Sequence, residues 1–69
     1  MTDTAKLNDR IKQSGYKKNY IAKVLGVAES TLARKVNNAQ DFKASEIDTL
    51  CALLGIDTLE EKESIFFAR

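Results

Sequence analysis

Three glycines divide the chain into short segments, and their placement restricts the fold more than any other feature of the sequence. Gly15, Gly26 and Gly55 each follow a segment whose apolar residues recur every three or four positions. This spacing predicts helices with one buried face. A glycine just after a helix can take the left-handed conformation that caps the last carbonyl groups. The sequence therefore predicts short helices and no strands.

Five helices are expected, at about residues 4–14, 17–25, 28–36, 44–54 and 59–67. The fourth has the clearest pattern, with apolar residues at i, i+3, i+4 and i+7. The fifth opens with Thr58–Glu61, whose spacing fits a capping box. Helices of about ten residues are marginal alone in water, so all five must share one core. We expect an all-α, compact five-helix bundle.

No proline, repeat or low-complexity tract interrupts the 69 residues, so the chain is expected to form a single domain over residues 1–69. It has no run of about 18 apolar residues that would cross a bilayer. Its first residues lack the apolar core of a signal peptide. We therefore expect a cytoplasmic protein that makes no contact with a membrane.

The composition argues against catalysis and metal binding. The chain has no histidine and one cysteine, which excludes an internal disulfide and a zinc site of the usual Cys/His kind. The remaining acids and bases form no recognisable catalytic constellation, and there is no glycine-rich phosphate loop. We expect no enzymatic activity, no cofactor, no metal and no small-molecule substrate.

The charges are segregated along the chain, although the net charge is only +1. Residues 1–37 hold eight Lys or Arg against three Asp or Glu, whereas residues 38–69 hold three against seven. The two parts therefore carry +5 and −4. Two interpretations remain open, which are scattered solvated charges and a basic face that meets phosphates.

The segment 18–37 reads KNYIAKVLGVAESTLARKVN. Ala22 lies four residues before Gly26, Val27 follows the glycine, and apolar Leu32 and Val36 lie in the next helix. This pattern resembles the helix-turn-helix, in which a small residue lets two steeply crossed helices approach and a glycine supplies the positive φ of the turn. Together with one helix before and two after, it resembles the five-helix, lambda repressor-like DNA-binding domains of phage repressors and Cro-like regulators.

The order Lys35-Val36 and the ending SIFFA are most similar to small Cro-like regulators and modulators of repression of temperate phages of Gram-positive bacteria. The resemblance implies a transcriptional regulator of a phage lysis-lysogeny switch, acting in the bacterial host cell. It implies that the third helix enters the major groove of an operator and that the start of the second helix meets phosphates.

Carried onto this sequence, the resemblance implies two sets of contact residues. The expected base-reading residues are Ala28, Glu29, Ser30, Thr31, Ala33 and Arg34. The expected phosphate contacts are Lys17, Lys18, Asn19, Lys35, Asn37 and Asn38. Tyr16 and Tyr20 flank the same region, where they either seal the edge of the core or contact phosphates.

Some residues depart from the pattern of a strong DNA binder. The start of the third helix lacks the family's familiar base-reading glutamine or asparagine, and Glu29 carries negative charge toward the DNA. Binding by a monomer would be weak, which favours a homodimer. The alternative is an antirepressor or modulator of repression that binds the phage repressor protein, with Phe66 and Phe67 as a hydrophobic anchor. Both hypotheses stay open on the sequence.

Overall fold

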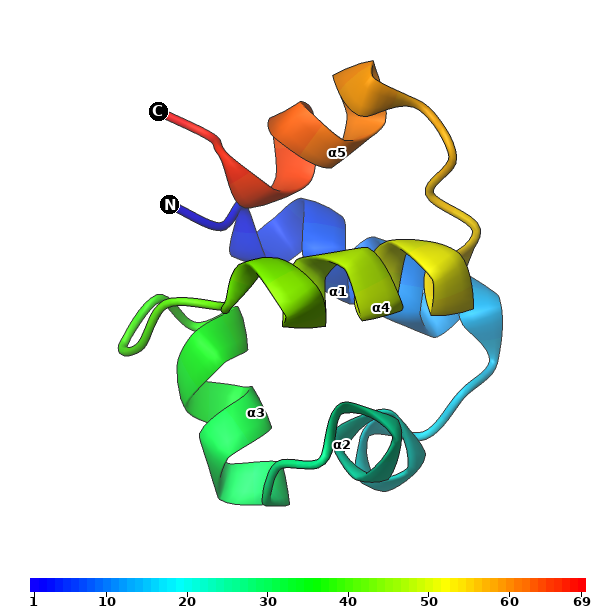
Figure 1. Cartoon of the computed structure of the whole chain (residues 1–69), viewed down its shortest axis with the longest axis vertical. Coiled ribbons are helices and arrows are strands. Elements are labelled where there is room, and N and C mark those ends of the chain that lie inside the picture. Colours follow the sequence, from blue (N-terminus) through cyan, green and yellow to red (C-terminus); the bar gives the residue numbers. More distant parts are fainter.

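Each glycine-punctuated segment is helical in the computed structural model, which describes residues 1–69. The helices are α1 (Thr4–Ser14), α2 (Lys18–Leu25), α3 (Glu29–Val36), α4 (Ala44–Leu54) and α5 (Leu59–Phe66) (Figure 1). The prediction of an all-α, five-helix fold is confirmed. Lys17 and Ala28 precede their helices in extended conformation, with ψ of 149° and 153°. The observed helices therefore begin one residue later than expected at these two positions.

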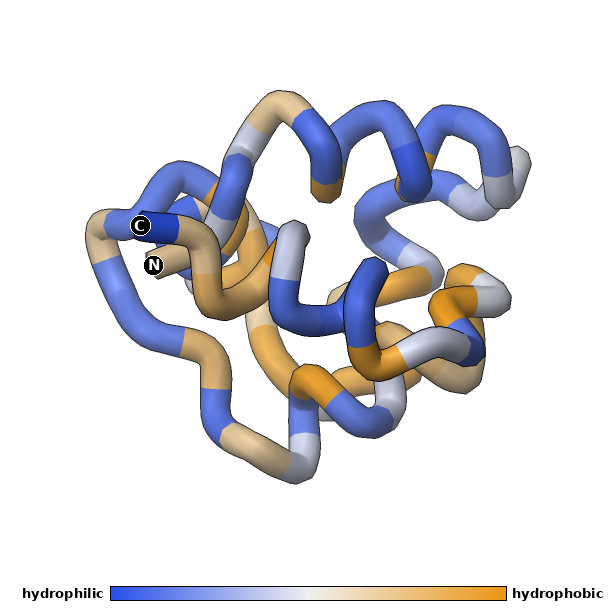
Figure 2. Tube along the Cα trace, turned by 90° about the horizontal axis from the view of Figure 1, so that it is seen from above, coloured by the Kyte–Doolittle hydropathy of each residue, from blue (hydrophilic) through white to orange (hydrophobic).

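All five helices contribute to one core. Blue and orange segments alternate along the helical turns in Figure 2, as expected of helices that bury one face each. The connection between α4 and α5 adds one further side chain. The buried apolar residues are Leu7, Ile11, Ile21, Ala22, Leu32, Val36, Ile47, Leu50, Leu54, Ile56, Ile65 and Phe66.

The two ends of the chain lie side by side and join α1 to α5 (Figure 1). The N–H of Asp3 donates to the carbonyl of Ile65 at 2.6 Å, and the N–H of Ala68 donates to the carbonyl of Met1 at 2.9 Å. Asp3 also caps α1, because its carboxylate accepts from the N–H of Lys6. The N-terminal residues are therefore a structural part of the bundle.

The expected capping box at α5 forms only in part. The Thr58 hydroxyl accepts from the N–H of Glu61 at 3.1 Å, as predicted. The Glu61 carboxylate turns instead toward Arg10 of α1, whose Nε lies 3.6 Å from Glu61 Oε2. Packing of α5 against α1 thus offers Glu61 a cation in place of a backbone N–H.

The turn between α2 and α3 has the backbone that the sequence predicts. Gly26 has a φ of +74°, and the N–H of Val27 donates across it to the carbonyl of Ala22 at 3.0 Å. A Cβ built on Gly26 meets no atom within 4 Å. The glycine is therefore required by its φ and not by lack of space.

Replacement of Gly26 should consequently cost backbone strain alone. We expect Gly26→Ala to lower the free energy of unfolding by about 1–2 kcal/mol, since an L-residue is strained at this φ. Gly26→Asn should cost less, because asparagine tolerates the left-handed region. Urea denaturation of both variants tests this, and an unchanged midpoint in Gly26→Ala would show that the turn does not need positive φ.

Candidate nucleic-acid interface

The pair α2 and α3 forms a steep crossing at one end of the bundle. Figure 1 shows α2 end-on and α3 running from top to bottom beside it, with α4 above both. Ala22 and Ile21 of α2 are buried in the core together with Leu32 of α3. In this geometry α2 supports α3, and the outer face of α3 remains exposed.

The first turns of α3 present short side chains to solvent. Ala28, Glu29 and Ser30 are exposed, as are Ala33 and Arg34 one turn further on, and Thr31 is half-buried. No side chain caps the N-terminus of α3. The structure thus leaves the expected base-reading surface accessible, and its contact with bases stays a prediction.

The start of α2 lies next to this surface and is suited to anions. Lys17, Lys18 and Asn19 are exposed, and no side chain accepts a hydrogen bond from the first turn of α2. Unpaired N–H groups and the helix dipole place partial positive charge at such a terminus. Two lysines therefore add their charge to a helix end that already favours phosphate.

The expected phosphate contact by Lys35 is wrong. Lys35 is only 2% exposed, and its Nζ donates to both carboxylate oxygens of Glu46, at 2.6 and 2.7 Å. Lys35 lies on the buried face of α3, three residues after Leu32 and directly before Val36. Its charge is neutralised inside the bundle and is not available to DNA.

Glu46 belongs to the first turn of α4 and has a second partner there. Its Oε1 accepts from the N–H of Lys43 at 2.8 Å, which caps the helix. Burial raises the pKa of Glu46, but the hydrogen bonds from Lys35 and from the Lys43 N–H, with the charge of both lysines, outweigh it. The net effect holds the pKa of Glu46 below its usual value, so the carboxylate is ionised at neutral pH.

Asn38 has partners within the protein, and its expected phosphate contact stays a prediction. Its Oδ1 accepts from the N–H of Thr2 at 2.8 Å, and its Nδ2 donates to the Thr2 carbonyl at 2.7 Å. Asn38 also has a φ of +65°, a conformation that asparagine tolerates better than most residues. Its side chain therefore holds the N-terminal segment, and both Asn38 and the neighbouring Asn37 are exposed.

The four aromatic residues considered on the sequence divide into one buried ring and three exposed ones. Phe66 is 4% exposed and packs edge-to-face on Phe42, with ring centroids 5.7 Å apart, so its expected role as a partner anchor is wrong. Phe67 is 56% exposed and remains accessible. Tyr16 and Tyr20 stack with centroids 5.2 Å apart and stay exposed beside the lysines of α2, so they do not seal the core.

The sequence did not point to Gln40, which lies beyond the helix-turn-helix. Arg34 donates from Nη2 to Thr31 Oγ1 at 3.1 Å and from Nε to Gln40 Oε1 at 3.5 Å. The spacing of Thr31 and Arg34 on one helix could have indicated the first contact. The second depends on a turn whose path the sequence does not reveal.

The acidic residues of α5 lie away from the helix-turn-helix. Figure 1 shows α5 at the opposite end of the bundle from α2 and α3. Exposed Glu60 and Glu63 belong to α5, whereas Glu29 is the one acidic residue between Lys18 and Asn37. The basic residues of α2 are therefore separated in space from the acidic residues of α5, whereas Arg10 of α1 lies beside Glu61.

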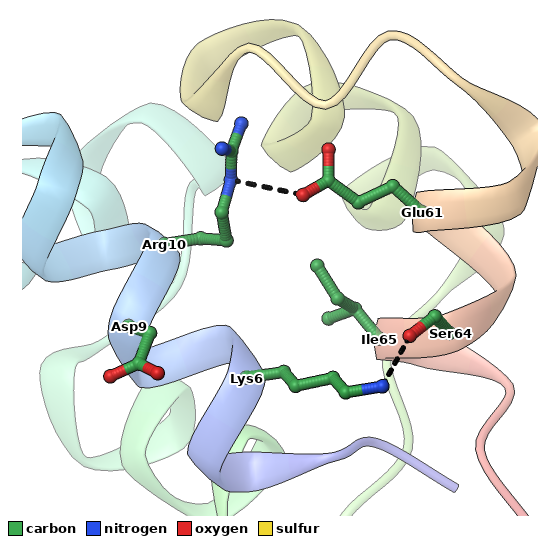
Figure 3. Close-up of a pocket in the computed structure, with 6 residues that line it drawn as sticks. All are labelled: Lys6, Asp9, Arg10, Glu61, Ser64 and Ile65. Carbon is green, nitrogen blue, oxygen red and sulfur yellow. Dashed lines mark hydrogen bonds and ion pairs between the residues drawn. The ribbon is translucent and has the colours of Figure 1, made fainter.

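The groove between α1 and α5 is an internal contact of the bundle (Figure 3). Its volume is about 270 Å³. Across it, Lys6 Nζ donates to Ser64 Oγ at 2.6 Å, and Arg10 Nε lies 3.6 Å from Glu61 Oε2. Arg10 Nη2 also donates to the carbonyl of Leu54, at the end of α4, at 2.8 Å. No group of three or more Cys, Asp or Glu side chains is placed to hold a metal ion.

No helix has the length and apolar character needed to cross a membrane.

A steeply crossed helix pair with a glycine turn, an exposed second helix and three bracing helices defines a helix-turn-helix DNA-binding domain. Residues 6–61 match the model of the Cro/C1-type HTH DNA-binding domain, and the chain belongs to this family. No curated protein and no solved structure matches the chain. The expected membership of a Cro-like helix-turn-helix family is thus confirmed.

Breaking the buried ion pair should destabilise the fold strongly. We expect Lys35→Met to lower the free energy of unfolding by about 3–5 kcal/mol, because it leaves the Glu46 carboxylate buried without a counter-ion. Combining it with Glu46→Leu should restore most of this loss, apart from the cap on Lys43. Thermal and urea unfolding measure both effects.

The matched control is Lys62→Met, since Lys62 pairs with the exposed Asp48 at 3.1 Å. An exposed pair contributes about 0–1 kcal/mol. Equal losses in Lys35→Met and Lys62→Met would show that the buried pair has no special weight.

The same pair should make stability depend on acid pH. Because the folded pKa of Glu46 is lowered from its usual 4.5, ionisation favours the folded state above that pH. This contribution is lost as pH falls through the folded pKa. We expect acid to destabilise the unaltered chain more than the variant that combines Lys35→Met with Glu46→Leu, measured by urea midpoints from about pH 7 to about pH 2. Parallel pH curves would contradict the assignment.

Proposed function

We propose that this chain is a transcriptional regulator that docks α3 in the major groove of an operator. The observation that carries the proposal is the accessible first half of α3, held across α2 by the Gly26 turn. The family supports it, because its domains bind DNA. At the finer level, the resemblance of the sequence to phage regulators favours a role in a lysis-lysogeny switch in the cytoplasm of a bacterial host.

Base reading is assigned to the outward residues of α3. Arg34 pairs with the O6 and N7 acceptors of guanine, Glu29 accepts from the N4 amino group of cytosine, and Ser30 contacts either base type. Ala28 and Ala33 offer apolar contact to thymine methyl groups. The half-buried Thr31 supports Arg34.

Phosphate contacts are assigned to the start of α2 and the end of α3. Lys17, Lys18 and Asn19 contact phosphates on one stretch of the DNA backbone, and Asn37 contacts a phosphate on another. About four to six contacts per monomer give modest affinity, since each adds about 0.9 to the salt slope. The longest dimension of the molecule is 28 Å, whereas half-sites on one face of DNA are about 34 Å apart. A homodimer on two half-sites fits both facts.

Binding to duplex DNA from the region upstream of its own gene tests the proposal. We expect a gel shift whose affinity falls steeply between about 50 and 200 mM salt. Lys18→Ala should weaken binding to all sequences and reduce the salt slope by about 1 per half-site. Lys62→Ala removes the same charge from α5, at the opposite end of the bundle, and should change neither quantity. No binding at low salt would refute the proposal.

A second candidate function rests on Phe67, which is exposed beside Leu59 and Glu63 at the C-terminal end. In this alternative the chain acts as an antirepressor or modulator of repression and binds the phage repressor. Co-elution with that repressor would then require Phe67, so Phe67→Ser would abolish it while DNA binding stayed absent. Family membership gives no added support to this alternative.

A further inference from the structure

The turn that follows α3 is held in one conformation by the backbone. Asn38 takes a left-handed conformation, and the N–H of Ala39 donates back to the carbonyl of Arg34 at 2.8 Å. The N–H of Asn38 also donates to the carbonyl of Lys35 at 3.3 Å. This closure resembles the one at Gly26, with asparagine in place of glycine. The chain therefore leaves α3 in a fixed direction.

The N-terminal segment holds the same turn from outside. Thr2 is buried and exchanges two hydrogen bonds with the Asn38 amide. The hydroxyl of Thr4 donates to the carbonyl of Val36 at 2.7 Å, at the last turn of α3. Two residues from the start of the chain thus fix the end of α3 and the turn after it.

This turn places Gln40 beside Arg34. The Arg34 Nε–H donates to Gln40 Oε1 at 3.5 Å, a long hydrogen bond, and Nη2 donates to Thr31 Oγ1 at 3.1 Å. In a planar guanidinium, Nε and Nη2 share one edge, while Nη1 and Nη2 share the other. Nη1 has no partner within the protein, so the outer edge is free to make two parallel hydrogen bonds.

We propose that Gln40 is a positioning residue that, with Thr31, aims Arg34 at one guanine in each half-site. The inference rests on the proposed DNA-binding function. Two acceptors on the inner edge, Thr31 Oγ1 and Gln40 Oε1, restrict the rotamers of a long, exposed side chain. The restriction lowers the entropy that Arg34 loses when its outer edge binds O6 and N7 of guanine.

The experiment is selection from a library of random 20-bp duplexes by the intact chain, followed by sequencing of the bound fraction. The unaltered protein should select guanine at one position of each half-site. Arg34→Ala should reduce that preference by about 5- to 150-fold, the range expected for a bidentate arginine–guanine pair. Gln40→Leu should reduce it by about two- to tenfold, the range expected for one hydrogen bond.

Two further variants separate positioning from a general effect. Gln40→Glu keeps an acceptor for Arg34 Nε, so guanine preference should persist although added negative charge lowers affinity for every duplex. Gln13→Leu is the matched control, because Gln13 Oε1 lies 3.5 Å from Nη1 of Arg10 on α1. It should leave the selected motif unchanged. Gln40 is exposed, so thermal unfolding of its variants should match that of the unaltered chain.

The outcomes distinguish the two proposals. Absence of any binding or selected motif overturns the DNA-binding function. A selected motif whose guanine preference survives Gln40→Leu, or disappears equally in Gln40→Glu, overturns the role of Gln40 alone. A motif that does not change in Arg34→Ala also overturns it. Loss of guanine preference in Gln40→Leu with retention in Gln40→Glu supports it.

Discussion

The ion pair between Lys35 and Glu46 is the contact on which the position of α3 depends most. Both oxygens of the carboxylate bind one ammonium group, and the same carboxylate caps α4 through the Lys43 N–H. One side chain thereby joins the end of α3 to the start of α4. Such a pair is weak evidence for high stability, because desolvation of two charges offsets their attraction. Its contribution is geometric, since neither charge can be accommodated in another packing without its partner.

The outward face of α3 is fixed because both ends of the helix are fixed. At the start, the Gly26 turn sets its crossing with α2. At the end, Lys35 reaches α4, Thr2 binds the Asn38 amide, and Thr4, the first residue of α1, binds the Val36 carbonyl. A helix of eight residues has little rigidity of its own in water. Rigid presentation therefore comes from tertiary contacts with α4 and with the N-terminal segment.

The sequence predicted the helices well because local signals decide them. Glycine positions and apolar spacing located every helix to within one residue at each end, and Gly26 has the expected positive φ. The errors in the site share one cause, which is that a polar side chain finds its partner only in the folded chain. Lys35 lies three residues after the buried Leu32, so the helical periodicity places it on the buried face. Its charge nevertheless favours exposure to solvent. Its partner lies eleven residues away on another helix.

Asn38 and Gln40 could not be predicted on local grounds. Asparagine at the end of a helix is compatible with either a free amide or a left-handed turn, and only the nearby Thr2 backbone decides between them. That pairing spans 36 positions of the chain. Gln40 then acquires its place beside Arg34 as a consequence of the turn. The adjacent rings at the C-terminus were ambiguous for a different reason, since a short helix can bury only one of Phe66 and Phe67.

The two helix N-termini of the motif differ in a way that divides their roles. Neither has a side-chain cap, but the first turn of α3 contains Glu29, whereas the first turn of α2 contains no acidic residue. A carboxylate at a helix start is stabilised by the same partial positive charge that would attract a phosphate. Glu29 therefore opposes an anion at the start of α3, whereas Lys17 and Lys18 add positive charge at the start of α2. In the proposed complex, the acidic residue that argued against DNA binding on the sequence would therefore help to keep phosphates at α2 and bases at α3.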